Sequence, residues 1–199
     1  KVSIFETYPA ENMRKVSEID VTLTPSEYLL SKPEIFIYED NLVALTAQES
    51  TSFQGKAYSS RCGFLATCPD DYTEYRTYAH IYDITDRSNP VLSNTVSASG
   101  FYNEARMIDG FVYFVANQYL GEQYILPSIQ ENNDEFVVKA DDIFYNTSVA
   151  QGSHFGFSTI VAIDIETGDA TSQASLAARS ENLYVSAGNI YTTYVDWDA

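Results

Sequence analysis

The sequence predicts an all-β protein, a β-propeller assembled from four-stranded antiparallel blades. Two kinds of short apolar segment alternate along the 199 residues, and both show the period-two pattern of half-buried strands. Phe, Tyr and Trp make up 14% of the chain, with 16 Tyr, and aromatic residues are favoured in strands. No apolar run of about 18 residues occurs, so we expect no membrane-spanning helix.

The first kind of segment is a hairpin that occurs three times. Its copies read EIFIYEDNLVALTA, EARMIDGFVYFVAN and ENLYVSAGNIYTTYV, and they begin at Glu34, Glu104 and Glu181. Asn, Asp and Gly tolerate the positive φ of two-residue hairpin turns. The predicted turns are therefore Asp40-Asn41, Asp109-Gly110 and Gly188-Asn189.

The second kind of segment is a strand that ends on an acidic residue, followed by a polar turn and a weaker strand. Copies begin at Val2, Ala79 and Thr159, with acidic ends at Glu6, Asp83 and Asp164. A hairpin followed by this pair gives four antiparallel strands, which is one propeller blade. The repeat is longer than the ~40 to 50 residues of an ordinary blade.

Two insertions account for the extra length, at residues 49–76 and 119–157. They occupy the same place in both units, so we expect them on one face, as is common where a repeat protein binds a partner. The order of the segments predicts a single domain over residues 1–199 with two full blades and a half-blade at either end. Propellers typically have four to eight blades, which favours a partial propeller. Ring closure between the last hairpin and the first strands is the alternative.

Charge narrows the class of partner. The chain has 11 basic and 28 acidic residues, a net charge of −17 and a pI near 4.2. Such a surface repels phosphate backbones and anionic lipid headgroups, so we expect no nucleic-acid partner.

Three features bear on the compartment. Lys1 begins the chain without an initiator Met or a leader, which is consistent with a segment cut from a longer precursor. Cys62 and Cys68 lie close enough in sequence for a small loop disulfide, and the sequence is equally consistent with two free thiols. Asn146 begins a glycosylation sequon.

Several phrases of the chain resemble a known family. These are ETYPAENMRKVSEID, PEIFIYEDNLVALTA, HIYDITDRSNPVLSNTVSASGFYNEARMIDGFVYFVAN and SENLYVSAGNIYTTYV. They are similar to the secreted β-propeller-domain proteins of archaea and some bacteria, which are distantly similar to WD-repeat propellers. The resemblance implies an extracellular or cell-surface location. The family has no assigned activity, so it implies no catalytic residues.

The candidate binding residues are side chains of the insertions. Tyr72, Tyr75 and Tyr124 are expected surface contacts for a protein or a glycan, because tyrosine combines a large contact area with a polar tip. His154, in the longer insertion, is the more plausible functional histidine, since loops carry sites. His80 lies in a strand pattern and is expected to be a strand-face residue.

Calcium is a further possibility, in two equivalent turns whose candidate ligands are Asp83, Asp86, Asp164 and Asp169. Calcium prefers oxygen ligands from loops. Neither turn matches the EF-hand pattern, and Asx turns between strands explain the same residues. No other cofactor is expected.

Two functional hypotheses follow. The first is a non-catalytic interaction or structural module outside the cytoplasm, which binds a protein or glycan through its loop-rich face. The alternative is a carboxylate-based hydrolase that acts on polysaccharide in the propeller channel. Convergence of carboxylates with an arginine such as Arg106 at the channel mouth would favour the hydrolase.

Overall fold

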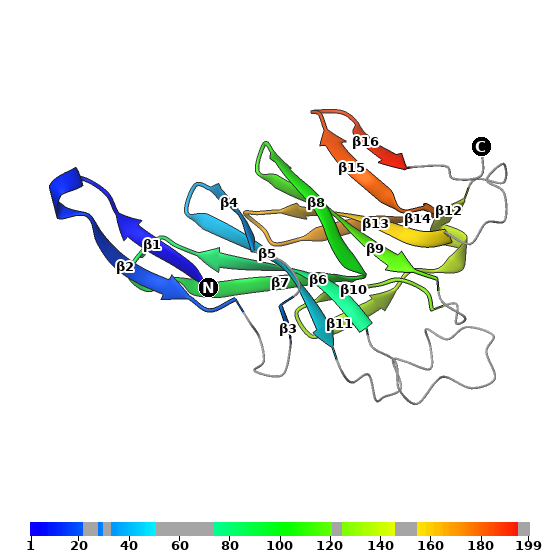
Figure 1. Cartoon of the computed structure of the whole chain (residues 1–199), viewed down its shortest axis with the longest axis horizontal. Coiled ribbons are helices and arrows are strands. Elements are labelled where there is room, and N and C mark those ends of the chain that lie inside the picture. The colour runs from blue at the N-terminus through cyan, green and yellow to red at the C-terminus, as the bar shows by residue number, and fades with distance from the viewer. Residues whose placement is uncertain (22–27, 30–32, 51–73, 121–124, 146–154, 195–199) are drawn as a thin grey trace.

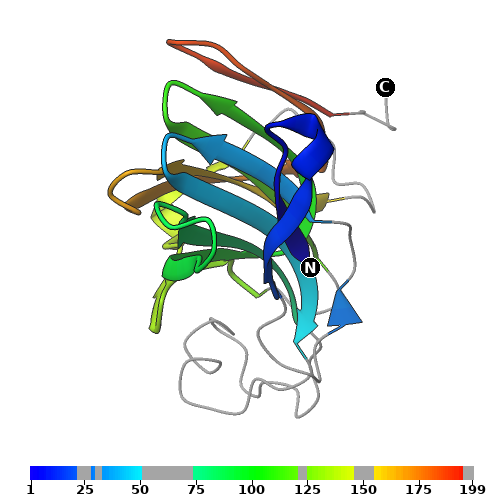
Figure 2. The same ribbon diagram turned by 90° about the vertical axis from the view of Figure 1, so that its left-hand side faces the viewer.

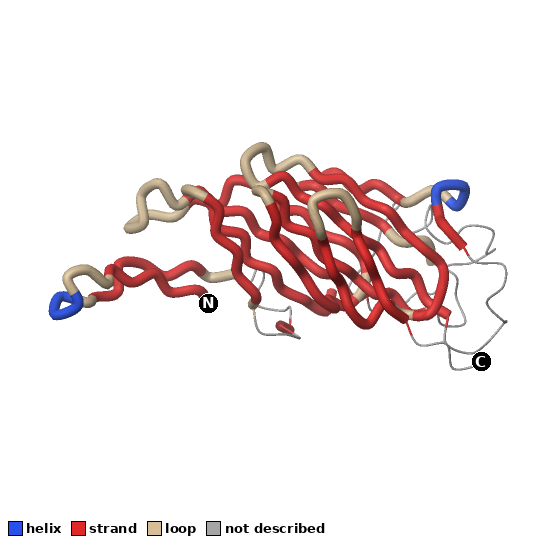
Figure 3. Tube along the Cα trace, turned by 90° about the horizontal axis from the view of Figure 1, so that it is seen from above, coloured by secondary structure: helices blue, strands red, loops and turns tan. Residues whose placement is uncertain are grey.

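The computed structural model describes residues 1–21, 28–29, 33–50, 74–120, 125–145 and 155–194. In these residues the chain is almost entirely β, as the sequence predicts (Figure 1). The helical elements there are two single turns of 3₁₀ helix, η1 (Ala10–Asn12) and η2 (Ala140–Asp142), which Figure 3 shows at opposite ends of the molecule. No helix within the described ranges is long and apolar enough to cross a membrane.

The first blade is an antiparallel sheet of four successive strands. These are β4 (Glu34–Tyr38), β5 (Asn41–Ser50), β6 (Glu74–Asp83) and β7 (Val91–Ser99). The sheet is extended beyond β7 by β10 (Ser128–Glu131) and β11 (Asp134–Val137), and the short β3 (Tyr28–Leu29) pairs with the last residues of β5.

The second blade repeats this arrangement. Its strands are β8 (Phe101–Ile108), β9 (Phe111–Tyr119), β13 (Phe155–Asp164) and β14 (Ala170–Ala178). A short strand, β12 (Ile143–Tyr145), pairs parallel with β14 at the outer edge.

One hairpin flanks the blades on each side. These are β1 (Val2–Glu6) with β2 (Arg14–Ile19), and β15 (Ser180–Val185) with β16 (Ile190–Tyr194). Figure 2 shows the hairpins β4–β5, β8–β9 and β15–β16 stacked in succession. The structure is a partial β-propeller.

The β1–β2 hairpin has the geometry of the outer half of a blade. Glu6 pairs with Arg14 as Asp83 pairs with Val91 in β6–β7. Both hairpins also shift register just before these pairs, between Ile4 and Phe5 and between Ile81 and Tyr82. The β1–β2 hairpin thus resembles the β6–β7 hairpin in register.

The hairpin turns differ in part from the sequence prediction. Tyr38 pairs with Asn41, so the first turn is Glu39-Asp40, one residue earlier than predicted, with Glu39 at φ 52°. The turn at Asp109-Gly110 is as predicted, and both residues have positive φ. In β15–β16, Val185 pairs with Ile190, which leaves a four-residue loop closed by a 2.9 Å hydrogen bond from the Ser186 N–H to the Asn189 carbonyl.

The strands also extend into the predicted insertions. β5 continues through Ser50 and β6 begins at Glu74, so residues 49–50 and 74–76 of the predicted insertion belong to strands. The second predicted insertion, 119–157, contains β10, β11 and β12. No strands are predicted here from the sequence, although the two-residue turn at Asn132-Asn133 is a hairpin signal that could have identified β10 and β11.

The main hydrophobic core lies between the two blades. Aliphatic residues of β5, β6 and β7, such as Val43, Ile81 and Val96, pack against Phe114 of β9 and Val161 of β13, all 0 to 1% exposed. Burial of this apolar surface is the main stabilising contribution and fixes the blades face to face. The positions of the strand ends follow from this packing.

Candidate functional site

A row of stacked side chains crosses from the first blade to the second. Tyr75 of β6 stacks on Phe101 of β8, with ring centroids 4.0 Å apart and an interplanar angle of 24°. Phe101 meets Tyr119 of β9 edge to face at 5.7 Å. The Arg179 guanidinium lies 4.7 Å from the centre of the Tyr119 ring and donates a hydrogen bond to its hydroxyl. These four residues are called the aromatic row.

The turn between the blades places Phe101 beside Tyr75. The Gly100 N–H donates a 2.6 Å hydrogen bond to the Tyr75 carbonyl. Gly100 has φ +115°, and a Cβ there would lie 2.7 Å from the carbonyl carbon of Asn117. Only glycine fits this backbone conformation and approach, so the sequence Gly100-Phe101 sets the start of the row.

The aromatic row lies at the strand ends that adjoin the two predicted insertions. Residues 51–73 precede Glu74, directly beside Tyr75, and β9 ends at Tyr119, opposite Gly156 near the start of β13. Tyr119 is 53% exposed. Of the predicted binding residues, Tyr75 lies within the described ranges, in strand β6 and stacked on Phe101 of the next blade.

The other predicted residues of the insertions lie outside the described ranges. These are the binding candidates Tyr72, Tyr124 and His154, the cysteines Cys62 and Cys68, and the sequon residue Asn146. The roles proposed for them stay predictions. Sequence reasoning missed Phe101 and Arg179, and it counted Tyr119 among the tyrosines that could line a binding face without selecting it, because the grouping of these residues depends on the stacking of two blades.

The carboxylates of the first candidate calcium turn bind backbone groups of the turn itself. Asp83 Oδ1 accepts a 2.8 Å hydrogen bond from the Thr85 N–H, and Asp86 Oδ1 accepts one of 2.9 Å from the Ser88 N–H. The bond from Thr85 lowers the pKa of Asp83, and the 2.6 Å bond from the Ser88 hydroxyl, together with the Ser88 N–H bond, lowers the pKa of Asp86. The turn has the contacts of Asx turns.

The equivalent turn of the second blade has similar contacts. Asp164 Oδ1 accepts a 2.9 Å hydrogen bond from the Glu166 N–H, and the Asp164 N–H donates one of 3.0 Å to the Asp169 carbonyl. Within the described part of the chain, no group of three or more His, Cys, Asp or Glu side chains is arranged to hold a metal ion. Calcium binding by these turns stays a prediction.

His80 is buried in the first blade, with 0% exposure. Its ring nitrogens lie 3.5 Å from the hydroxyls of Thr46 and Thr95, and its ring stacks on Tyr78 at 5.7 Å. Burial lowers the pKa of His80 to about 4, so the ring is neutral at pH 7. Its position in the strand agrees with the prediction of a strand-face residue.

A second buried polar group connects β6 to the β10–β11 extension. Arg76 is 1% exposed, and its guanidinium donates to the Ser97 hydroxyl at 3.2 Å and to the Ser128 hydroxyl at 3.0 Å. Its Nη1 also lies 3.5 Å from Glu135, which accepts a 2.7 Å bond from Ser128. The contacts of Arg76 show that the extension is an integral part of the blade.

Glutamates at equivalent hairpin positions join the first strands of successive blades. Glu34 of β4 accepts a hydrogen bond from the Tyr102 hydroxyl of β8. Glu104 of β8 accepts one of 2.5 Å from the Leu183 N–H of β15 and pairs with Arg106. Burial, together with the bond to Glu34, raises the pKa of Tyr102. Two carboxylates and Arg106 thus surround Tyr102.

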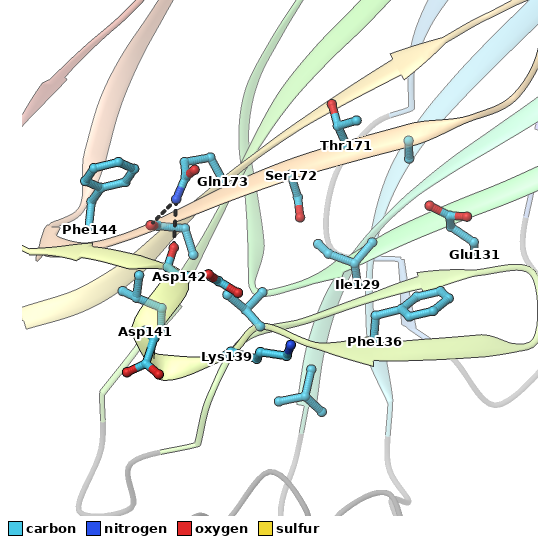
Figure 4. Close-up of a pocket in the computed structure, with 15 residues that line it drawn as sticks. Ile129, Glu131, Phe136, Lys139, Asp141, Asp142, Phe144, Thr171, Ser172 and Gln173 are labelled. Carbon is cyan, nitrogen blue, oxygen red and sulfur yellow. Dashed lines mark hydrogen bonds between the residues drawn. The ribbon is translucent and has the colours of Figure 1, made fainter.

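A groove of about 700 Å³ separates the outer edges of the two blades (Figure 4). One wall is the β10–β11 hairpin of the first blade, the other is β14 of the second, and η2 closes one end. Its apolar lining includes Ile129, Phe136 and Phe144, and its polar lining includes Glu131, Lys139, Asp141, Asp142 and Gln173.

Comparison with known proteins agrees with this architecture. The family model described as a β-propeller domain matches residues 1–199, the whole chain. Searches of curated proteins and of solved structures found no match. Stacked four-stranded sheets and a family match of this extent show that the chain belongs to the β-propeller-domain family.

Proposed function

We propose that this chain is a non-catalytic module of the cell exterior that binds a protein or glycan partner through the aromatic row. The β-propeller fold itself indicates a protein-interaction or structural module. The observation that supports a particular surface is the contact of Tyr75, Phe101, Tyr119 and Arg179 at the strand ends that adjoin the two predicted insertions. Propeller loops at one end of the blades are common binding surfaces.

The chemistry of the aromatic row suits either class of partner. Tyr119 has one aromatic face under Arg179 and is still 53% exposed. A rigid ring held in this way loses little conformational entropy on binding, and a tyrosine offers both a stacking surface and a hydroxyl. Truncation of such a residue to alanine typically weakens binding strongly.

Binding of a glycan partner is tested with two alanine variants on a glycan array. Tyr119→Ala removes the exposed ring of the aromatic row, and Tyr8→Ala, at an 87% exposed tyrosine of the β1–β2 loop, is the control. We expect Tyr119→Ala to weaken binding by about tenfold, the loss typical of an aromatic anchor, and Tyr8→Ala to leave it unchanged. Equal binding by both variants would contradict a role for the row.

The proposed location at the cell exterior has an independent test. It is supported by the Asn146 sequon and by the spacing of Cys62 and Cys68, since disulfides persist in oxidising compartments. Mass spectrometry of the protein secreted by its native cells should show neither cysteine alkylated until a reductant is added. Alkylation of both thiols without reductant would argue against that compartment.

A hydrolase remains the second candidate, and the grouping of Glu34, Glu104 and Arg106 around Tyr102 is the observation that favours it. Two carboxylates can serve as acid and base in glycoside hydrolysis. The hydrogen bonds that hold these glutamates also have a structural explanation, because they join successive blades. Release of reducing sugar from polysaccharide, lost in Glu34→Gln but retained in Glu18→Gln, would favour the hydrolase. Absence of turnover in the unmodified chain would favour the module.

A further inference from the structure

We infer that the groove between the outer edges of the blades binds an extended, basic peptide segment that pairs as an added strand with the free edge of β14. This site is separate from the aromatic row, and it involves different strands. The inference rests on a free strand edge, an apolar lining and an excess of carboxylates, all in one groove (Figure 4).

The free edge is the first part of β14. β12 pairs with β14 only from Ala174 to Leu176. Over Ala170–Gln173, the strand that pairs with β14 in the described chain is β13, on the opposite side. Half of the backbone N–H and C=O groups of an edge strand point away from its partner and can pair with a further strand. Extended peptides bind many proteins by this kind of strand addition.

The end of the free edge is fixed by a side chain. The Gln173 amide donates a 2.9 Å hydrogen bond to the Asp142 carbonyl in η2 and another of 3.2 Å to the Ala174 carbonyl (Figure 4). The chain before β12 therefore leaves β14 as η2 instead of continuing along its edge. A peptide can follow β14 only as far as Gln173, which sets the length of the paired segment at about four residues.

The opposite wall supplies the apolar contacts. Ile129 and Phe136 are directly paired in β10–β11, so their side chains share one face, and both line the groove. Phe136 is 55% exposed, and Phe144, near the closed end, is 68% exposed. Successive side chains of a strand point to opposite faces, so alternate residues of the peptide would contact Ile129 and Phe136.

The charges of the lining select a basic segment. The groove has the carboxylates of Glu131, Asp141 and Asp142 but one ammonium group, Lys139. The net charge of the whole chain, −17, has the same sign. Complementary charge speeds association and discriminates against acidic segments. An alternation of lysine with valine or phenylalanine meets both the apolar and the charge requirements.

The experiment uses the capped hexapeptide Lys-Val-Lys-Phe-Lys-Val as the probe, in 0.15 M salt, with binding followed by fluorescence anisotropy. Two further peptides carry backbone N-methyl groups on the three lysines or on the other three residues. Strand addition predicts that one methylated peptide binds at least tenfold more weakly and that the other binds like the parent. Equal binding of both methylated peptides would overturn the proposal, because adhesion to an acidic surface needs no backbone pairing.

Two variants of the protein locate the site. Phe136→Ala should weaken binding of the parent peptide at least fivefold. Phe5→Ala, at a 53% exposed phenylalanine of β1, should leave that binding unchanged. An unchanged affinity in Phe136→Ala would overturn the groove as the site. Tyr119→Ala should leave peptide binding intact. The proposal of a peptide site in the groove and the proposal of a binding site at the aromatic row are therefore tested by different variants.

Discussion

The side-chain amide of Asn94 in β7 donates a 2.8 Å hydrogen bond to the carbonyl of Gly168, which lies in the turn between β13 and β14. The bond joins the outer strand of the first blade to a turn of the second. Gly168 has φ +78°, and a Cβ there would lie 2.5 Å from Asn94 Nδ2. A glycine and a polar side chain thus complement each other across the interface between the blades.

Replacement of this glycine should destabilise the chain. Gly168→Ala is expected to lower the free energy of unfolding by about 1 to 2 kcal/mol, because alanine is strained at positive φ and its methyl group displaces the Asn94 amide. Gly188→Ala is the control, since nothing lies within 4 Å of its added Cβ, and it should change stability by less than about 0.5 kcal/mol. Urea unfolding measures both. Equal losses in the two variants would refute the contact.

Stability should fall at mildly acidic pH because of His80. Its pKa is about 4 in the folded chain against an ordinary 6.5, so the unfolded state takes up the proton first as the pH decreases. The contribution of His80 is complete above about pH 6.5 and is lost progressively towards pH 4. The expected loss is on the order of 2 to 3 kcal/mol.

A variant isolates this effect from the titration of carboxylates. Urea unfolding of the unmodified chain and of His80→Gln at pH 7.5 and pH 4.5 should show a smaller decrease in the variant. The other histidine of the chain, His154, is present in both proteins and cancels in the comparison. Identical pH dependence of the two proteins would show that folding does not lower the pKa of His80.

Arg76 should be among the most costly side chains to remove. Arg76→Ala removes the hydrogen bonds to the Ser97 and Ser128 hydroxyls and the positive charge 3.5 Å from Glu135, and removal of one member of a buried ion pair typically costs about 3 to 5 kcal/mol. Arg87→Ala, which breaks an exposed pair with Asp40, should cost less than about 1 kcal/mol. Thermal unfolding compares the two, and similar melting temperatures would contradict the structural role of Arg76.

Calcium binding by the turns at Asp83 and Asp164 is tested by melting with 5 mM calcium and with excess chelator. A bound ion raises the melting temperature by mass action, and Asp86→Asn with Asp169→Asn should abolish that increase. An unchanged midpoint in the unmodified chain would favour the Asx-turn interpretation.

The strands of the two blades could be predicted from the sequence because each carries its own local signal. The alternation in EIFIYEDNLVALTA and the Asp109-Gly110 turn depend on neighbouring residues alone, and the acidic ends at Asp83 and Asp164 mark equivalent turns. The first turn lies one residue earlier in the structure than the predicted Asp40-Asn41, because Glu39, not Asn41, adopts positive φ. Local propensity identifies the turn but does not fix its register.

The candidate sites were predictable only in part. Tyr75 was identified from its position in a predicted insertion, but Phe101, on which it stacks, and Tyr119, which contacts Phe101, lie in strands of another blade. The groove lies between β10–β11 and β14, which belong to different sheets. Such contacts arise from the packing of whole blades, and this packing is not encoded in any single segment.

Site-specific photo-crosslinking tests the central claim most directly. A photoreactive phenylalanine analogue is placed at position 119, in the aromatic row, or at position 8, in the β1–β2 loop, and each protein is irradiated on the surface of its native cells. The account predicts a discrete crosslinked protein or glycoconjugate from position 119 and none from position 8. The same products from both positions, or none from position 119, would contradict binding through the row.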